Sequence, residues 1–196
     1  MDKIFTCKSI QTSLVIMTTK KLTLMAILTA IALIIFIIEA QIPLPIPIPG
    51  VKLGLANAVT LFALFYAGRK AEEPSPCFFS ASNVFAILLC RIILGAVFTG
   101  RPIAFVYSIA GGLLAFAVQV IMKRFVSRKQ IWVCGAIGAA FHNIGQITAA
   151  VIITGTPAIA AYLPILIIAG ILTGILTGFI AQFTLMRLNG VFVKVL

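Results

Sequence analysis

The sequence predicts an all-α integral membrane protein with six transmembrane helices and with both termini in the cytoplasm. Of its 196 residues, 62% are hydrophobic and only 10% are charged, a composition far more apolar than that of a soluble domain. The mean hydropathy is +1.20. Six apolar stretches are separated by short polar or turn-forming segments, and the basic residues gather in alternate loops. These observations predict a multi-pass protein of the cell membrane.

The six predicted spans approach the roughly 20 residues that a helix needs to cross a bilayer. They cover residues 22–38, 53–67, 78–98, 103–122, 131–153 and 158–186. The second is short and the last is long, which predicts a tilted or bent end. The transmembrane domain is placed at residues 20–190. Residues 1–19 are a cytoplasmic segment, either disordered or upstream of a start at Met17, and residues 191–196 are a tail.

The placement of the basic residues sets the predicted orientation. Twelve of them fall on one side of the predicted spans: Lys3, Lys8, Lys20, Lys21, Arg69, Lys70, Lys123, Arg124, Arg128, Lys129, Arg187 and Lys194. The opposite loops hold Lys52 and Arg101. By the positive-inside rule the first set faces the cytoplasm. The net charge of +11 therefore sets topology, and we predict no nucleic-acid partner.

A proline-rich segment, I-P-L-P-I-P-I-P-G-V-K-L-G-L-A-N, joins the first two predicted spans on the outer side. Proline excludes a regular helix and cannot supply a complete strand ladder, so the segment should run extended until a glycine lets it turn. We predict that it forms a lid over a binding cavity. The predicted lid residues are Pro43, Pro45, Pro47, Pro49 and Gly50.

Arg91 lies inside the third predicted span. A charge within a span costs a few kcal/mol on insertion scales, so it normally faces a cavity, a partner or the interface. Snorkelling toward the outer surface is the structural alternative. We favour a substrate-binding role, because arginine suits an anionic group such as a carboxylate or a phosphate.

Three further polar residues cluster in the fifth predicted span, in F-H-N-I-G-Q. His142 and Gln146 are four residues apart, and Asn143 is three from Gln146, so all three lie on or next to one helical face. Hydrogen bonding between helices could account for two of them, but we favour a binding site. Asn57, at the start of the second span, is also a candidate, although the sequence alone favours capping of the helix or bonding across helices.

Small residues recur at four-residue spacing in the first and sixth predicted spans. Such spacing lets helices approach closely. Ala26 and Ala30 mark the first span, and Gly170, Gly174 and Gly178 mark the sixth. Packing within the bundle explains both sets without any further function.

The sequence contains none of the catalytic motifs that we sought. Aspartate occurs once, at Asp2, and no P-loop, G-x-S-x-G or H-E-x-x-H motif is present. The four cysteines are scattered, without a C-x-x-C pair. We predict that the chain is not an enzyme and that it has neither a metal site nor a cofactor.

Several strings resemble the Gx transporter family, whose members are often labelled heptaprenyl diphosphate synthase component I. They are I-P-G-V-K-L-G-L-A-N, S-I-A-G-G, G-A-I-G-A-A-F-H-N-I-G-Q and Y-L-P, together with the span that holds Arg91. The family is similar to the S-components of energy-coupling factor (ECF) vitamin transporters. Those proteins have six helices, an outer lid loop, and small residues on the first helix that dock to an ECF-type ATPase and transmembrane module.

The resemblance implies docking roles for Ala26 and Ala30, a lid role for the proline stretch, and pocket roles for His142, Asn143 and Gln146. Our leading hypothesis is a membrane-embedded substrate-binding subunit for uptake of a vitamin-like or cofactor-like small molecule, in contact with membrane lipid and with a separate energising module. The alternative is a non-catalytic membrane subunit for heptaprenyl diphosphate or isoprenoid quinone synthesis. The aspartate-rich motifs of a prenyl synthase, which hold Mg²⁺, are absent.

Overall fold

The computed structural model describes residues 19–42, 52–67 and 80–191, which fold into a bundle of helices. The α-helices are α2 (Thr19–Glu39), α3 (Asn57–Ala67), α4 (Ala81–Thr99), α5 (Pro102–Met122), α6 (Ile131–Thr154) and α7 (Leu163–Val191). Two short 3₁₀ helices, η1 (Arg128–Gln130) and η2 (Pro157–Tyr162), precede α6 and α7. The described part contains no strand, and the predicted all-α class is confirmed.

Five helices, α2 and α4 to α7, are long and apolar enough to cross a membrane. Their outward faces carry large apolar side chains, for example Val97, Ile152 and Phe179, which are 73%, 75% and 49% exposed. An apolar outer face of this extent suits contact with lipid rather than with water. The protein is therefore a multi-pass membrane protein.

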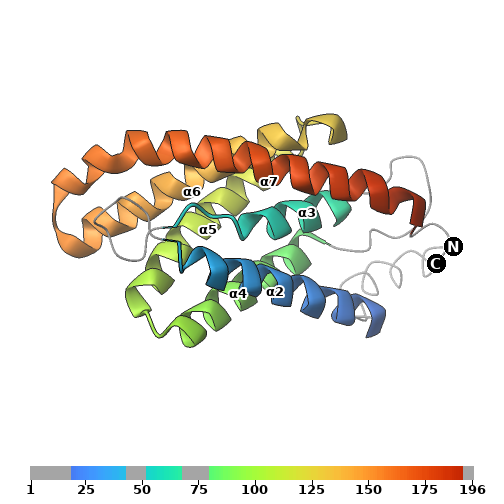
Figure 1. Ribbon diagram of the computed structural model, residues 1–196, viewed down its shortest axis with the longest axis horizontal. Helices are drawn as coiled ribbons and strands as arrows, with labels where there is room; N and C mark the ends of the chain where they lie inside the picture. Colours follow the sequence, from blue (N-terminus) through green and yellow to red (C-terminus); the bar gives the residue numbers. More distant parts are fainter. Residues whose placement is uncertain (1–18, 43–51, 68–79, 192–196) are drawn as a thin grey trace, which may run out of the picture.

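The second predicted span, at residues 53–67, does not form a full-length helix. Gly54 has a positive φ of +83°, and the helical part, α3, begins only at Asn57. At 1.5 Å per residue the 11 residues of α3 extend about 16 Å, roughly half the thickness of a hydrocarbon core. Six full spans are therefore not confirmed. α3 lies inside the bundle, between α2 and α7 (Figure 1).

The sixth predicted span, residues 158–186, falls within the apolar helical stretch Pro157–Arg187, which is long enough to cross a membrane, but its first residues are not α-helical. Residues 158–162 belong to the 3₁₀ helix η2, and α7 starts at Leu163, with Pro164 in its first turn. The first residue of α2 and the last turn of α7 lie at the same end of the bundle (Figure 1). That this end faces the cytoplasm stays a prediction from the charges. The predicted lid, residues 43–50, lies outside the described residues.

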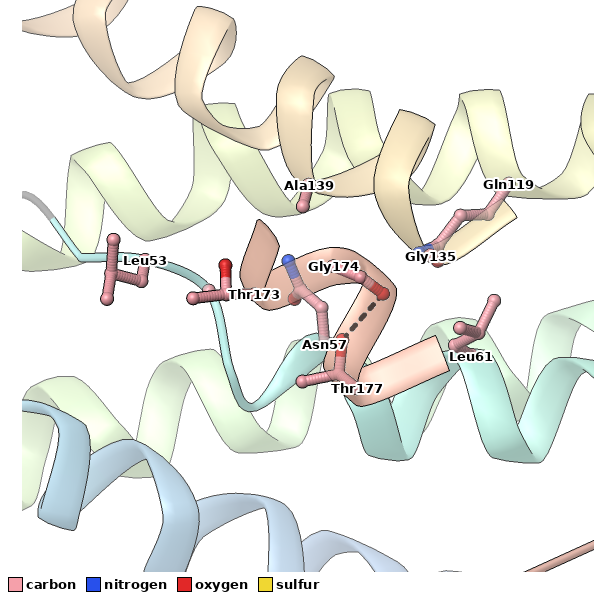
Figure 2. A pocket seen from close by; sticks show the side chains of 10 residues that line it. Leu53, Asn57, Leu61, Gln119, Gly135, Ala139, Thr173, Gly174 and Thr177 are labelled. Atoms are coloured by element: carbon pink, nitrogen blue, oxygen red, sulfur yellow. Dashed lines mark hydrogen bonds between the residues drawn. The ribbon is translucent and has the colours of Figure 1, made fainter. Parts of the chain in front are cut away.

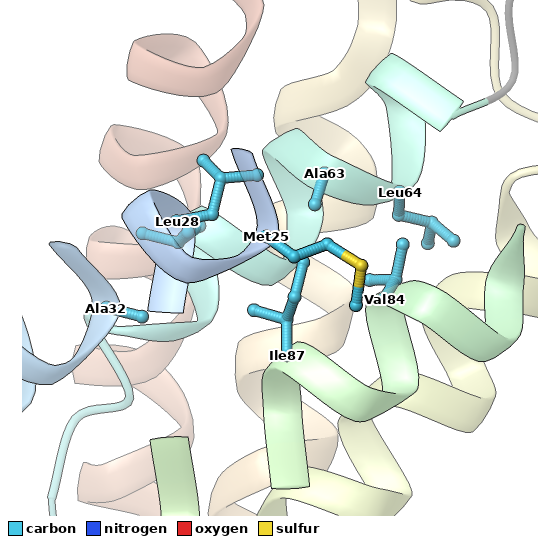
Figure 3. Packing of buried hydrophobic residues seen from close by; sticks show 8 residues of the cluster. Met25, Leu28, Ala32, Ala63, Leu64, Val84 and Ile87 are labelled. Atoms are coloured by element: carbon cyan, nitrogen blue, oxygen red, sulfur yellow. The ribbon is translucent and has the colours of Figure 1, made fainter. Parts of the chain in front are cut away.

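The buried apolar residues form three clusters that join the helices. One lies between α2, α3 and α4, and Figure 3 shows its side chains: Met25, Leu28, Ala32, Ala63, Leu64, Val84 and Ile87. A second joins α5, α6 and α7 around Tyr107 and Leu166. The third joins α3, α6 and α7 around Leu61 and Cys134. Through the first and third clusters, the short helix α3 connects α2 and α4 to the α6–α7 pair.

Glycines let α6 and α7 pack closely. A Cβ added at Gly174 would lie 2.5 Å from the carbonyl oxygen of Gly135, and one at Gly178 would lie 2.5 Å from the Cα of Trp132. Real Cβ atoms essentially never approach other atoms so closely. The close packing predicted from Gly170, Gly174 and Gly178 is confirmed, and its partner is α6.

Gly174→Ala should destabilise the bundle, because the new methyl group has to push α6 away. Overpacking of this kind costs about 1–3 kcal/mol, which should lower the thermal midpoint in detergent by several degrees. Leu176→Ala is the matched control, since the Leu176 side chain is 58% exposed on the same helix. Equal midpoints for Gly174→Ala and the wild type would contradict this account of the packing.

Candidate functional site

Polar and charged side chains gather where the end of α2 meets the start of α3, next to α4 and α6. Each of them is no more than 8% exposed. We call this set the charged cluster: Glu39, Lys52, Asn57, Arg91, His142 and Gln146. The sequence predicted four of the six, Asn57, Arg91, His142 and Gln146, as substrate-binding residues, and the fold brings these four together.

Arg91 points into the bundle. It is 2% exposed, and its Nη2 donates a hydrogen bond to Oδ1 of Asn57 at 3.2 Å. Its Nε is buried without an acceptor. Snorkelling to the surface, the structural alternative for this residue, is therefore wrong. Asn57 bonds across helices through its oxygen, while its Nδ2 has no partner.

Lys52 supplies a second buried cation. Its Nζ lies 3.2 Å from the centroid of the Phe36 ring, a cation–π contact, and has no hydrogen-bond acceptor. The guanidinium carbon of Arg91 lies 5.8 Å from the centroid of the same ring. Burial lowers the pKa of Lys52 to about 8; the charge of Glu39 opposes this shift, while those of Arg91 and Arg101 add to it.

Glu39 is the only carboxylic side chain in the described part of the chain. It is the last residue of α2 and is 5% exposed. Its Oε1 accepts a hydrogen bond from the backbone N–H of Gly54 at 2.5 Å, and the backbone of Leu55 also acts on the carboxylate. The charges of Arg91 and Lys52 attract it. The cluster therefore holds two cationic side chains and one carboxylate.

His142 and Gln146 support the cluster from α6. The Nε2 atoms of the two side chains lie 2.8 Å apart; because the amide nitrogen can only donate, the imidazole Nε2 accepts. The Gln146 oxygen accepts a hydrogen bond from the backbone N–H of Lys52 at 3.1 Å. A Cβ added at Gly54 would lie 2.8 Å from Cδ2 of His142. The chain can therefore pass His142 at this distance only with glycine at position 54.

Asn143 faces a different neighbour. Its Nδ2 donates a hydrogen bond to the carbonyl oxygen of Leu166 in α7 at 2.5 Å. Consecutive residues of a helix point about 100° apart, so Asn143 cannot share the direction of His142. Of the three predicted polar residues of α6, His142 and Gln146 join the cluster, whereas Asn143 connects α6 to α7.

A small cavity adjoins the cluster at Asn57. Figure 2 shows the Asn57 side chain pointing into it, beside Ala139 and Gly174. Thr173 and Thr177 of α7 also line the cavity. Its volume is about 10 Å³, enough for about one water molecule. A larger molecule can enter only if the surrounding elements move apart.

Glu39 and Lys52 were missed as site residues by the sequence-based reasoning. The available signal was weak but present: Glu39 is one of four acidic residues in the chain, and it flanks a span. Lys52 is one of two basic residues on the predicted outer side. Ala26 and Ala30 lie elsewhere, on an exposed face of α2, and their docking role stays a prediction.

The fold and the cluster define a multi-pass helical membrane protein with a charged site buried in its bundle. A family model described as heptaprenyl diphosphate synthase component I matches residues 28–184, well over half of the chain. The protein belongs to that family. Searches of curated proteins and of solved structures gave no significant match.

Replacing Gln146 with Leu should loosen the segment before α3. The change removes the acceptor of the Lys52 N–H, and one hydrogen bond contributes about 1 kcal/mol, so the Lys52 amide should exchange about fivefold faster. Hydrogen–deuterium exchange of a peptide covering residues 52–56 measures this. Thr148→Val on the exposed face of α6 is the control, since its hydroxyl bonds only within its own helix in the described structure. Unchanged exchange in Gln146→Leu would contradict the role of this bond.

Proposed function

We propose that the protein is a non-catalytic, membrane-embedded binding subunit that takes up a small anionic molecule, vitamin-like or cofactor-like. It captures the molecule from the outer side and works with a separate energising module. The observation that supports this best is the burial of Lys52 and Arg91 with unpartnered N–H groups, at Lys52 Nζ and Arg91 Nε.

Two buried cations are costly inside a membrane protein, and sites of this kind usually serve a ligand or an ion. Glu39 is the only acidic side chain beside these two basic ones in the described part of the chain, so the basic side chains outnumber it. The unpartnered atoms of Lys52 and Arg91, together with Nδ2 of Asn57, are all hydrogen-bond donors. Their natural complement is a group with several acceptor oxygens and a negative charge, namely a carboxylate or a phosphate.

Binding in this proposal requires an opening movement, because the cavity at Asn57 has a volume of only about 10 Å³. The non-helical residues 52–56 are the element best suited to move. Hydrogen bonds to distant residues hold them: Gly54 and Leu55 interact through their backbone with Glu39, and the Lys52 N–H bonds to Gln146. In this proposal the proline stretch at residues 43–50, which lies outside the described residues, is the lid over the cavity.

Two observations support an energising partner. The family is described as a component, which implies that its members work with another subunit. In addition, Ala26 and Ala30 lie on an exposed face of α2, where small side chains would let a partner helix approach closely. In this proposal the partner is an ATPase-containing module like that of the ECF vitamin transporters.

A second candidate function is that of a non-catalytic membrane subunit in heptaprenyl diphosphate or isoprenoid quinone synthesis. The family description favours it. So does an apolar groove of about 370 Å³ between α2, α3 and α7, lined by side chains that include Leu24, Ile31, Val59, Phe62 and Ile180. A hydrocarbon chain would fit the chemistry of this groove.

Purification in mild detergent, followed by mass spectrometry of bound small molecules and proteins, separates the two candidates. An anionic vitamin-like or cofactor-like molecule at near one-to-one occupancy supports the binding subunit. A tightly held soluble prenyl synthase, with no bound small molecule, would overturn it in favour of the second candidate.

Arg91→Ala and His142→Ala should each reduce the amount of the co-purified molecule. Arg91 loses a charged contact and His142 loses the support of the cluster, so we expect at least about a tenfold loss for Arg91→Ala. The thermal midpoint tests that the variants are folded, and Arg124→Ala at an exposed position is the control. Full occupancy in both folded variants would return the two residues to a structural role.

Leucine at both Ala26 and Ala30 should block recovery of the partner and leave the small molecule bound. The larger side chains would keep a partner helix from approaching α2. Affinity purification of a tagged chain from its native membrane measures both quantities. Ala117→Leu, at an exposed position of α5, is the matched control. Normal partner recovery by the double variant would refute the docking assignment.

A further inference from the structure

The carboxylate of Glu39 lies in a buried environment of hydrogen-bond donors and basic side chains, which suits an anion. It accepts a hydrogen bond from the backbone N–H of Gly54, and Leu55 adds a further backbone interaction. These two residues lie just before the first residue of α3, where the helix presents its partial positive charge. Lys52 and Arg91 attract the same carboxylate. The groups identified around the carboxylate are thus donors or cations.

The Glu39 carboxylate alone does not provide hydrogen-bond acceptors for all the buried donors around it. Nζ of Lys52 and Nε of Arg91 find no acceptor, although the two residues are only 6% and 2% exposed. Nδ2 of Asn57 is likewise buried without a partner and points into the cavity seen in Figure 2. A phosphate or carboxylate from outside could offer acceptors to these donors, and a phosphate would bring more oxygen atoms than the side chain of Glu39 has.

Glu39 also has a mechanical role. It ends α2, whereas its partner Gly54 lies 15 residues later and directly precedes α3. The hydrogen bond between them therefore closes the proline-containing connection between the two helices. Loss of this bond would weaken the attachment of residues 52–56 to the end of α2 and leave the Lys52–Gln146 bond and the contact of Lys52 with the Phe36 ring to hold them.

We propose that Glu39 is a built-in counter-ion that an anionic ligand displaces, and that this exchange releases the 52–56 segment from the end of α2. The inference rests on the proposed function and deepens it, because it assigns the site to ligands that carry a carboxylate or phosphate group. A neutral ligand would not compete with the carboxylate for Lys52 and Arg91. The site therefore selects for negatively charged ligands. An anion has to bind strongly enough to displace Glu39 before residues 52–56 are released.

Glu39→Gln tests the exchange, with inorganic phosphate as the probe and the thermal midpoint in detergent as the readout. The amide keeps the size of the side chain and an oxygen for the Gly54 N–H, but it removes the competing charge. Without phosphate the variant should melt below the wild type, since two buried cations have lost their counter-ion. Phosphate should restore the midpoint, with half-saturation at a concentration about tenfold lower than in the wild type.

Three further variants make the result specific. Glu73→Gln, the same change outside the described residues, should respond to phosphate like the wild type. Glu39→Gln combined with Arg91→Ala should lose the response, because a cation of the site is gone. Glu39→Asp keeps the charge on a shorter side chain and should bind phosphate more tightly than the wild type does; it keeps the test open if Glu39→Gln fails to fold.

Equal half-saturation in the wild type, Glu39→Gln and Glu39→Asp would overturn the counter-ion role. So would an unchanged phosphate response in the Glu39→Gln/Arg91→Ala double variant. Mass spectrometry of the same wild-type preparations separates this failure from that of the proposed function. A bound anionic molecule in the wild type together with equal phosphate responses refutes only the role of Glu39, whereas a wild type with neither a bound molecule nor a phosphate response refutes both.

Discussion

The burial of Lys52 and Arg91 beside a single carboxylate is the constraint around which this part of the bundle is arranged. Neither cation is more than 6% exposed, and charges that are kept from water need compensation from nearby groups. Glu39 and the ring of Phe36 supply it from α2, and the amide oxygen of Asn57 supplies it from the start of α3. The cluster thus connects α2, the turn before α3, and α4, while Gln146 connects the same turn to α6.

Glycines make this arrangement sterically possible. Gly54 combines a φ of +83° with a close approach to His142. In α5, a Cβ at Gly111 would lie 2.7 Å from the carbonyl oxygen of His142 and 2.8 Å from Cγ of Gln146. Two glycines from separate elements therefore allow close packing around the His142–Gln146 pair. The same principle lets Gly174 bring α7 against Gly135.

The short helix α3 separates two environments. At its first residue, Asn57 faces the charged cluster and the small cavity. Farther along, Val59 and Phe62 line the apolar groove between α2 and α7. If the second predicted span were helical over its full length, residues 53–56 next to the charged cluster would belong to a regular helix. The late start of α3 instead leaves a non-helical turn before it, whose Gly54 N–H binds Glu39. The binding subunit and the synthase partner proposed above draw on different side chains of the same half of this helix, Asn57 and Leu61 for the cavity and Val59 and Phe62 for the groove.

The sequence by itself determined the helical membrane class, the small-residue contact of α7, and four residues of the cluster. Composition and apolar length report directly on a membrane environment, and charged or amide side chains inside apolar segments stand out. Only the tertiary structure decided that α3 is short, that Asn143 bonds to α7, and that Glu39 and Lys52 belong to the site. These outcomes depend on which segments meet in space. Glu39 and Gly54 lie 15 residues apart, and Lys52 and Gln146 lie 94 apart, so no local pattern in the sequence records either contact.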